Sequence, residues 1–196
     1  MIQVPAGFQP RRVASGSKLP AGLYVCAIEG AKVENTGYNN APQLKVMVEI
    51  IEGDYINYFH QDYQTRASGQ YADQAKYKGV IKLNLPSAQD DDKRKLWNTR
   101  SLEGFTYAVN ESNPGYTWNY DENALKGKKI GINVRNASYN GNAYTEIAYA
   151  ESVEDIRAGR AKVAPDRKPR GDANDSGLTY DSQSGMQAVN EPELPF

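Results

Sequence analysis

Apolar and polar residues alternate over several short stretches of the chain, which is the pattern of β-strands with one buried face. Residues 44–50 alternate most regularly, and residues 23–33 predict a strand that bends near Gly30. A third strand is expected over residues 55–63, and a short one over residues 80–85. The strands expected over residues 23–33, 44–50 and 55–63 predict an antiparallel meander. The polar residues 64–79, which connect the third strand to the short one, are expected to form a loop.

A helix is predicted to begin near Lys93 and to end before Pro114, with a break near Ser101 as one alternative. Residues 90–92 are three aspartates, whose charges suit the positive end of a helix dipole. They could also belong to a metal site, but no histidine accompanies them, so capping is the better reading. The apolar residues at helical spacing should face the core: Leu96, Leu102, Phe105 and Val109.

Residues 129–150 predict a β-hairpin whose turn is Asn140-Gly141, a pair typical of type I′ turns. Counting back from the turn gives four expected pairs: Ile132 with Tyr149, Val134 with Ile147, Arg135 with Glu146, and Ala137 with Tyr144. After the hairpin, Ser152 and Asp155 indicate a capping box for a short helix.

The charges are distributed unevenly, although the net charge is only −1. Residues 1–170 hold all 23 Lys and Arg residues, whereas residues 171–196 hold five acidic residues and no basic one. Such a segment has too little apolar surface to offset the entropy of ordering, so we expect it to be disordered. A mildly basic body with an acidic tail suggests a polyanion-binding surface and a separate partner-binding tail.

The chain ends in a short acidic and aromatic tip, which predicts docking into a basic and apolar pocket of a partner. The docking residues are Glu191, Glu193, Leu194, Pro195 and Phe196. The alternative is a tail that ends in Phe by chance.

Basic residues interleaved with tyrosines are typical of single-strand binding, in which phosphates meet cations and bases stack on rings. The candidate phosphate contacts are Lys76, Lys78, Lys82, Lys126, Lys128 and Arg135. The candidate stacking rings are Tyr58, Tyr63, Tyr77, Trp118, Tyr139 and Tyr144. Trp118 is expected to be exposed, because it lies in a segment rich in Pro and Gly. The alternative for each ring is packing in the core, and the alternative for residues 64–79 is a solvated loop.

Catalytic motifs are missing from the sequence, so we expect no enzyme, no cofactor and no metal. Cys26 and His60 are single residues of their kind, which leaves no thiolate zinc cluster and no recognisable dyad. Cys26 is expected in the core, and Glu49 is interpreted as an ordinary strand-end charge. No apolar run is long enough for a membrane span and no signal peptide is evident, so a cytoplasmic protein is expected.

The predicted order of strands, helix and final hairpin is that of an OB-fold barrel. Residues 21–160 resemble the DNA-binding domain of phage-encoded single-stranded-DNA-binding proteins of Gram-positive bacteria. The stretches that carry the resemblance are residues 19–24 (LPAGLY), 112–116 (SNPGY), 125–128 (LKGK) and 156–159 (IRAG), together with the terminal Pro-Phe. The long connection 64–79 and a tip with few acids depart from that pattern.

The resemblance implies a mainly β protein with a five-stranded antiparallel barrel and one main helix between strands 3 and 4. It divides the chain into an N-terminal arm (1–20), the DNA-binding domain (21–160), an acidic linker (161–190) and the docking tip (191–196). It implies binding of single-stranded DNA without strong sequence preference during phage replication and recombination, in the cytoplasm of a bacterial host. The tip would recruit replication or recombination enzymes, and a homo-oligomer is compatible with this reading.

Two other functions stay open at this point. The chain could be an accessory protein that acts mainly through protein contacts and binds DNA weakly. It could also be a phage nuclease or another enzyme whose site we do not recognise, which metal-dependent turnover of DNA would indicate.

Overall fold

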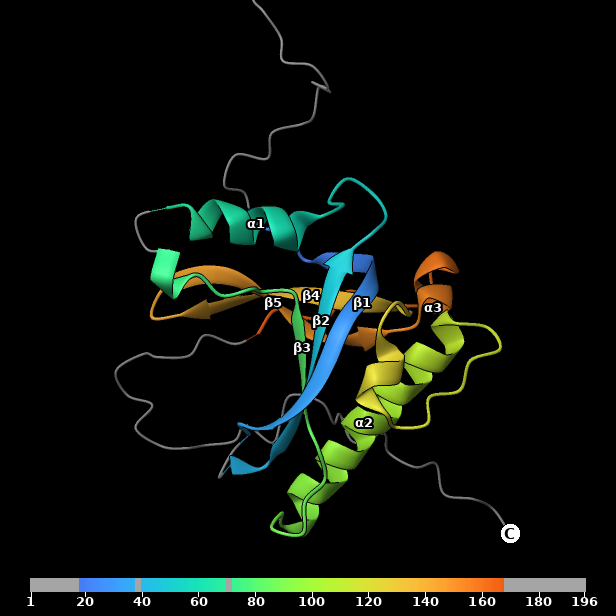
Figure 1. Cartoon of the computed structure of the whole chain (residues 1–196). Helices are drawn as coiled ribbons and strands as arrows, with labels where there is room; N and C mark the ends of the chain where they lie inside the picture. Colours follow the sequence, from blue (N-terminus) through green and yellow to red (C-terminus); the bar gives the residue numbers. More distant parts are fainter. Residues whose placement is uncertain (1–17, 38–39, 70–71, 168–196) are drawn as a thin grey trace, which may run out of the picture.

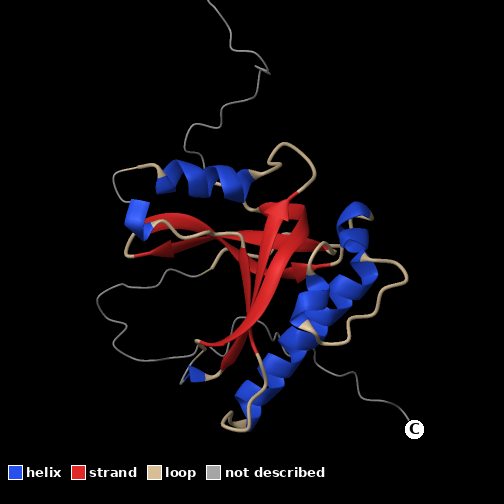
Figure 2. Cartoon of the chain, viewed as in Figure 1, coloured by secondary structure: helices blue, strands red, loops and turns tan. Residues whose placement is uncertain are grey.

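A curved five-stranded antiparallel sheet forms the centre of the protein (Figures 1 and 2). The computed structural model describes residues 18–37, 40–69 and 72–167. The strands are β1 (Gly22–Asn35), β2 (Pro42–Ile50), β3 (Val80–Asn84), β4 (Lys129–Tyr139) and β5 (Asn142–Glu151). Their order across the sheet is β3-β2-β1-β4-β5. A five-stranded antiparallel sheet with the main helix between its third and fourth strands is confirmed, although residues 55–63, expected as the third strand, are not part of it.

The sheet is not closed, so the expected barrel is not confirmed. The edge strands β3 and β5 approach each other, but no ladder of hydrogen bonds joins them. β3 has only five residues, and all of them pair with β2.

Three helices lie outside the sheet: α1 (Tyr58–Ala67), α2 (Asp92–Ser112) and α3 (Val153–Arg157). Two short 3₁₀ helices, η2 (Ala72–Gln74) and η3 (Glu122–Leu125), complete the described part of the chain. In Figure 1, α1 lies across one end of the sheet and α2 packs at the other end beside α3. None of the helices in the described ranges is both long and apolar enough to cross a membrane.

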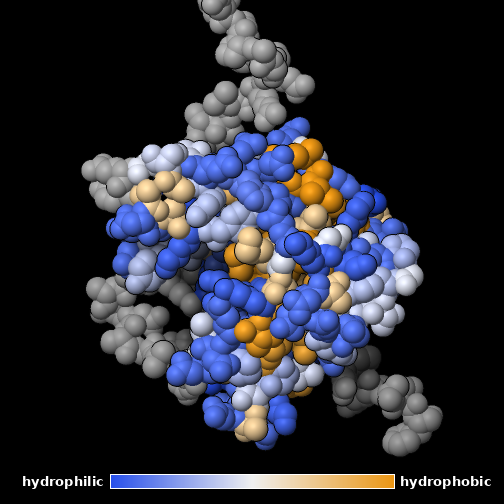
Figure 3. Space-filling model, in the orientation of Figure 1, coloured by the Kyte–Doolittle hydropathy of each residue, from blue (hydrophilic) through white to orange (hydrophobic). Residues whose placement is uncertain are grey.

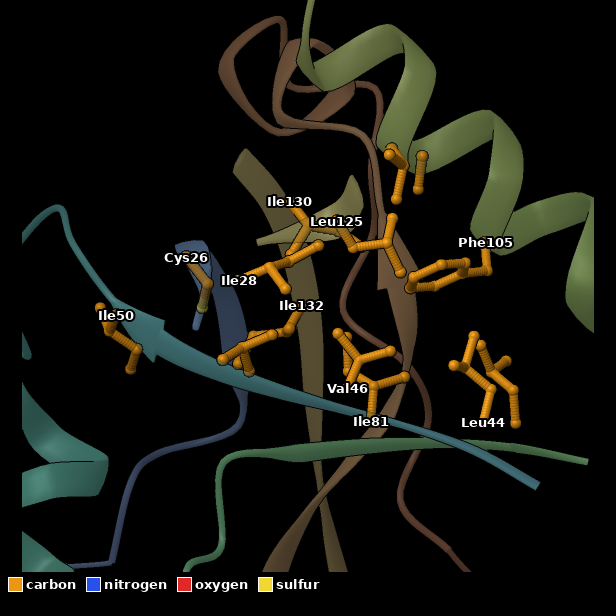
Figure 4. Close-up of a cluster of buried hydrophobic side chains, with 14 of the residues drawn as sticks. Cys26, Ile28, Leu44, Val46, Ile50, Ile81, Phe105, Leu125, Ile130 and Ile132 are labelled. Carbon is orange, nitrogen blue, oxygen red and sulfur yellow. The ribbon is translucent and has the colours of Figure 1, made fainter. Parts of the chain in front are cut away.

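The core is built by the alternating apolar residues of the strands, which meet Phe105 of α2 and Leu125 of η3 (Figure 4). Cys26 is fully buried among them, as expected, and burial raises the pKa of its thiol. Alternate residues of a strand point to one face of the sheet. The alternation of apolar and polar residues in these strands therefore predicts which of their side chains are buried.

The expected third strand is wrong, because residues 58–67 form helix α1. Asn57, the residue before the helix, has a left-handed backbone and gives no side-chain cap. The cap comes instead from Glu49 of β2, whose carboxylate accepts hydrogen bonds from the backbone N–H groups of Phe59 (3.1 Å) and His60 (2.7 Å). A partner distant in sequence therefore stabilises a helix start that local residues do not predict.

Helix α2 is one continuous helix, so the break near Ser101 does not occur. Its N-cap is Asp91, whose side chain accepts a hydrogen bond from the N–H of Arg94 at 2.8 Å, which supports capping. The expected inward position of Leu96 is wrong, since its side chain is 49% exposed. The buried face runs through Asn98 and Phe105, and Leu96 lies roughly 200° around the helix from Asn98.

The hairpin register is confirmed for three of the four expected pairs. A shift between Asn133 and Val134 moves the fourth, so Ile132 pairs with Ala150 and Tyr149 with Asn133. Ser152 is confirmed as the N-cap, because its Oγ atom accepts a hydrogen bond from the N–H of Asp155 at 2.9 Å, while the hydroxyl of Ser152, in place of its backbone N–H, donates to the Asp155 carboxylate at 2.7 Å.

The segment after α3, which the sequence assigns to the linker, lies along β4 up to Arg167. The buried side chain of Asn133 donates to the carbonyl of Lys162 at 2.8 Å and accepts from the N–H of Ala164 at 2.9 Å. The N–H of Arg167 donates to the carbonyl of Asn136 at 2.9 Å. The folded body therefore extends beyond residue 160.

Candidate nucleic-acid interface

A groove of about 640 Å³ separates strand β5 from the segment that leads into β3. Residues 76–82 form one wall and residues 144–147 the other. The lining residues are Lys18, Tyr58, Lys76, Tyr77, Lys78, Val80, Lys82, Tyr144, Thr145, Glu146 and Ile147. In Figure 3 the side of the molecule that carries η2 and the β4–β5 hairpin is mostly hydrophilic.

The 76–82 wall is held against the sheet by close backbone packing at Gly79. A Cβ atom on Gly79 would overlap the carbonyl oxygen of Val48 and the ring of Phe59. The N–H of Val48 also donates to the carbonyl of Gly79 at 2.8 Å. Because only glycine permits this approach, Tyr77 and Lys78 are set at a fixed height above β2.

Positive charge dominates the groove, which is lined by Lys18, Lys76, Lys78 and Lys82. The ammonium groups of Lys76 and Lys82 form no ion pair with another described residue. Lys78 lies 3.5 Å from a carboxylate oxygen of Asp62, and Lys18 donates to the carbonyl of Ala143.

Glu146 is the one carboxylate in the described lining, and two arginines offset its charge. Arg135 meets Glu146 at 2.8 Å and 2.9 Å, and Arg167 meets it at 2.9 Å and 3.1 Å. Both arginines share the partly buried carboxylate in charge-assisted hydrogen bonds, which are stronger than neutral ones. The groove therefore presents a net positive field to a ligand.

Three tyrosine rings line the groove, and two of them are fixed by their hydroxyl groups. The hydroxyl of Tyr77 donates to the carbonyl of Val48 at 3.0 Å, and its burial with Glu49 beside it raises its pKa. The hydroxyl of Tyr58 accepts from the N–H of Leu19 at 2.9 Å. Tyr144, on the opposite wall, is 38% exposed. Rings held in place lose little entropy when a base stacks on them.

The buried carboxylate of Glu49 in β2 contacts both α1 and the 76–82 wall. The interpretation of Glu49 from the sequence, as an ordinary charge at a strand end, is therefore wrong. Glu49 is 3% exposed and meets Nδ1 of His60 at 2.7 Å and the hydroxyl of Tyr77 at 3.0 Å. Its only sequence signal was an acidic residue between Val48 and Ile50, and nothing in the sequence indicated its partners. No cluster of metal-ligating side chains occurs among residues 18–37, 40–69 and 72–167.

The structure brings together six of the predicted residues in the groove. The six are Tyr58, Lys76, Tyr77, Lys78, Lys82 and Tyr144. Tyr63 is not in the groove lining, and its ring lies edge-on to Tyr77 with 6.1 Å between the ring centroids. Arg135 reaches the groove only through Glu146.

Four other predicted residues lie away from this lining. Tyr139 is 58% exposed beside the hairpin turn. Lys126 follows η3, and the Lys128 ammonium lies 4.1 Å from the ring centroid of Tyr116. The fourth residue, Trp118, is buried.

The sequence predicts that Trp118 is exposed. This prediction is wrong, because Trp118 belongs to the core. Its side chain is 4% exposed, and its ring packs edge-on against Phe105 with the centroids 5.5 Å apart. The indole Nε1 donates to the carbonyl of Asp121 at 2.8 Å. The Pro-Gly segment before it folds back over α2, so loop composition was a poor guide to exposure.

Sequence reasoning missed four polar groups at or beside the groove: Lys18, Thr145, Glu146 and Arg167. The sequence places Lys18 only within the N-terminal arm, residues 1–20, and predicts no contact for it. Arg167 carried no signal, because its contact with β5 spans a long sequence separation. The docking tip, Glu191 to Phe196, lies outside the described residues.

Neither a scan against protein-family models nor a search of curated proteins found a match.

Proposed function

We propose that this protein binds single-stranded DNA, without strong sequence preference, in the groove between residues 76–82 and 144–147. The observation that carries the proposal is the convergence of four lysines and three tyrosines from separate segments on one groove. The one carboxylate in its described lining is already paired with two arginines.

The chemistry of the groove suits unpaired nucleotides. Lysine ammonium groups bind phosphates regardless of base, and tyrosine faces accept any unstacked base, with about 1–3 kcal/mol per stacked base. Bases in a duplex are already stacked and paired, so they cannot use the rings of Tyr77 and Tyr144. A single strand is therefore the favoured ligand over duplex DNA.

The fold supports the same proposal. The order of three strands, the main helix and a final hairpin is that of the OB-fold, a partly open five-stranded barrel. OB-folds bind oligonucleotides through their strand faces and through the loop between strands 4 and 5. Here Tyr144 and Thr145 belong to the β4–β5 hairpin and form one wall of the groove.

We place this binding activity in DNA replication or recombination of a phage, in the bacterial cytoplasm, with a non-catalytic role. The acidic end from Glu191 to Phe196 would recruit the enzymes that act on the single-stranded DNA to which the protein is bound. This part of the proposal rests on the sequence of the tip and on the resemblance of residues 21–160 to phage single-stranded-DNA-binding proteins.

The proposal is tested by fluorescence anisotropy with labelled oligo-dT and with a duplex of the same length, over a range of salt concentrations. Oligo-dT should bind more tightly, and its affinity should fall as salt rises, because each neutralised phosphate releases about 0.7 counterion. Equal retention of single strand and duplex, or retention of neither, would instead favour the accessory protein that acts through protein contacts.

A further inference from the structure

A second hollow lies where the sheet is open, between the edge strands β3 and β5 and beneath helix α2. We call it the seam cleft; its volume is about 340 Å³. It is lined by residues 81–84 of β3 and 147–150 of β5, and by Asn98, Arg100, Ser101, Gly104 and Phe105 of α2.

Gly104 lines the seam cleft without contributing a side chain. A Cβ atom on Gly104 would meet no heavy atom within 4 Å. Gly104 lies inside α2, where glycine weakens a helix relative to almost any other residue. A larger residue at this lining position would therefore favour the helix and would meet no steric obstacle at its Cβ atom.

The described lining of the seam cleft contains two cations and no carboxylate. The cations are Lys82 and Arg100, and neither forms an ion pair or a side-chain hydrogen bond with another described residue. A hollow that concentrates positive charge in this way favours an anionic ligand.

The remaining lining suits a nucleotide. Tyr149 is 47% exposed and provides an aromatic ring for a base. The Oδ1 atom of Asn84 accepts from Gln43 at 2.9 Å. Its Nδ2 atom has no partner in the described part of the chain, so it can donate to a base or a phosphate.

The seam cleft adjoins the groove, since Lys82 and Ile147 line both hollows. We infer that a single strand bound in the groove continues past Lys82 into the seam cleft, where Arg100 holds a phosphate and Tyr149 contacts a base. This inference rests on the proposed function of the groove. The unpaired edges of β3 and β5 would also suit an extended peptide, but the adjoining basic groove and the exposed ring of Tyr149 favour a nucleic acid.

The test compares two lengths of oligo-dT, of about 6 and about 15 nucleotides, within the range of site sizes known for OB-folds. The variants are Arg100→Ala, which removes the proposed phosphate contact, and Gly104→Leu, which adds a bulky side chain to the cleft lining. Lys95→Ala is the control, because Lys95 is an exposed cation of the same helix that does not line the cleft.

Both variants should bind the long oligonucleotide about tenfold more weakly than the wild type and the short one equally well. Lys95→Ala should change neither affinity. Gly104→Leu should raise the melting temperature, because leucine favours a helix more than glycine does. A loss of affinity in this variant would therefore not reflect unfolding.

Wild-type affinity of both variants for the long oligonucleotide would overturn the inference and leave the groove itself unaffected. If no oligonucleotide binds the wild-type protein, the proposed function fails as well. A synthetic peptide of residues 187–196 provides the third arm. Binding of this peptide that depends on Arg100, with long-oligonucleotide binding unchanged, would make the cleft a peptide site and contradict the inference.

Discussion

The hydroxyl group of Tyr77 lies 3.0 Å from the carboxylate of Glu49, so the wall of the groove is tied directly to a buried charge of strand β2. The same carboxylate accepts hydrogen bonds from the first turn of α1. One buried group thus positions both the helix and the ring that would face a bound base. A buried carboxylate is tolerated only when such donors surround it.

Replacing Glu49 with Gln should destabilise the protein by about 2–3 kcal/mol, because an amide cannot accept from all the donors that now face the carboxylate. Urea unfolding measures the change. Glu52→Gln is the control, since the pair that Glu52 forms with Arg157 at 2.6 Å is exposed and should contribute less than about 1 kcal/mol. Equal stability of the two variants would show that Glu49 does not anchor α1.

Trp118→Ala should lower the free energy of unfolding by about 3–5 kcal/mol, because the ring is buried against Phe105. Trp118→Phe keeps most of the apolar contact and should retain wild-type affinity for oligo-dT in the folded protein. Chemical denaturation and anisotropy measure the two effects. If the Trp118→Ala protein is as stable as the wild type but fails to bind oligo-dT, Trp118 contacts DNA and the assignment to the core is wrong.

Tyr144→Ala should weaken oligo-dT binding by about 1–3 kcal/mol, the range found for stacking contacts. Its stability should change little, since the ring stands exposed on the groove wall. Tyr139→Ala is the matched control on the same hairpin, and it should bind as the wild type does. A loss of the thermal transition in Tyr144→Ala would mean that its ring supports the fold.

Deleting residues 191–196 should leave the thermal transition unchanged and should not weaken DNA binding, because the acidic end repels phosphate. It should abolish capture of replication or recombination enzymes from a host lysate. Pull-downs with the full-length and shortened proteins compare the two. Capture of the same enzymes by both proteins would remove the tip from the proposal.

Local patterns predicted the parts of the fold that depend on neighbours in sequence. The hydrophobic pattern located β1, β2 and β3 but also predicted a strand at residues 55–63, and the Asn140-Gly141 turn set the hairpin register up to the shift at Asn133. Helix α1 was missed because its cap comes from Glu49, and Trp118 was misplaced because its segment packs on a distant helix.

Composition found the residue types of the groove but not their arrangement. Lys76 and Lys82 share the groove with Tyr144, which lies more than fifty residues away in the chain. The equally basic Lys126 and Lys128 lie elsewhere, and no sequence pattern separates the two pairs. Only the path of the chain in space decides which cations face a common ligand.

The different positions of these two lysine pairs provide the most direct test of binding in the groove. The test compares the salt dependence of oligo-dT affinity for three proteins: the wild type, the double variant Lys76→Ala/Lys82→Ala, and the double variant Lys126→Ala/Lys128→Ala. Both double variants remove the same charge. The groove predicts that the first loses affinity and that its salt slope falls by about 1.4, at about 0.7 for each lost phosphate contact. It predicts wild-type affinity and slope for the second. Equal losses in the two double variants, or a loss in the second alone, would contradict binding in the groove.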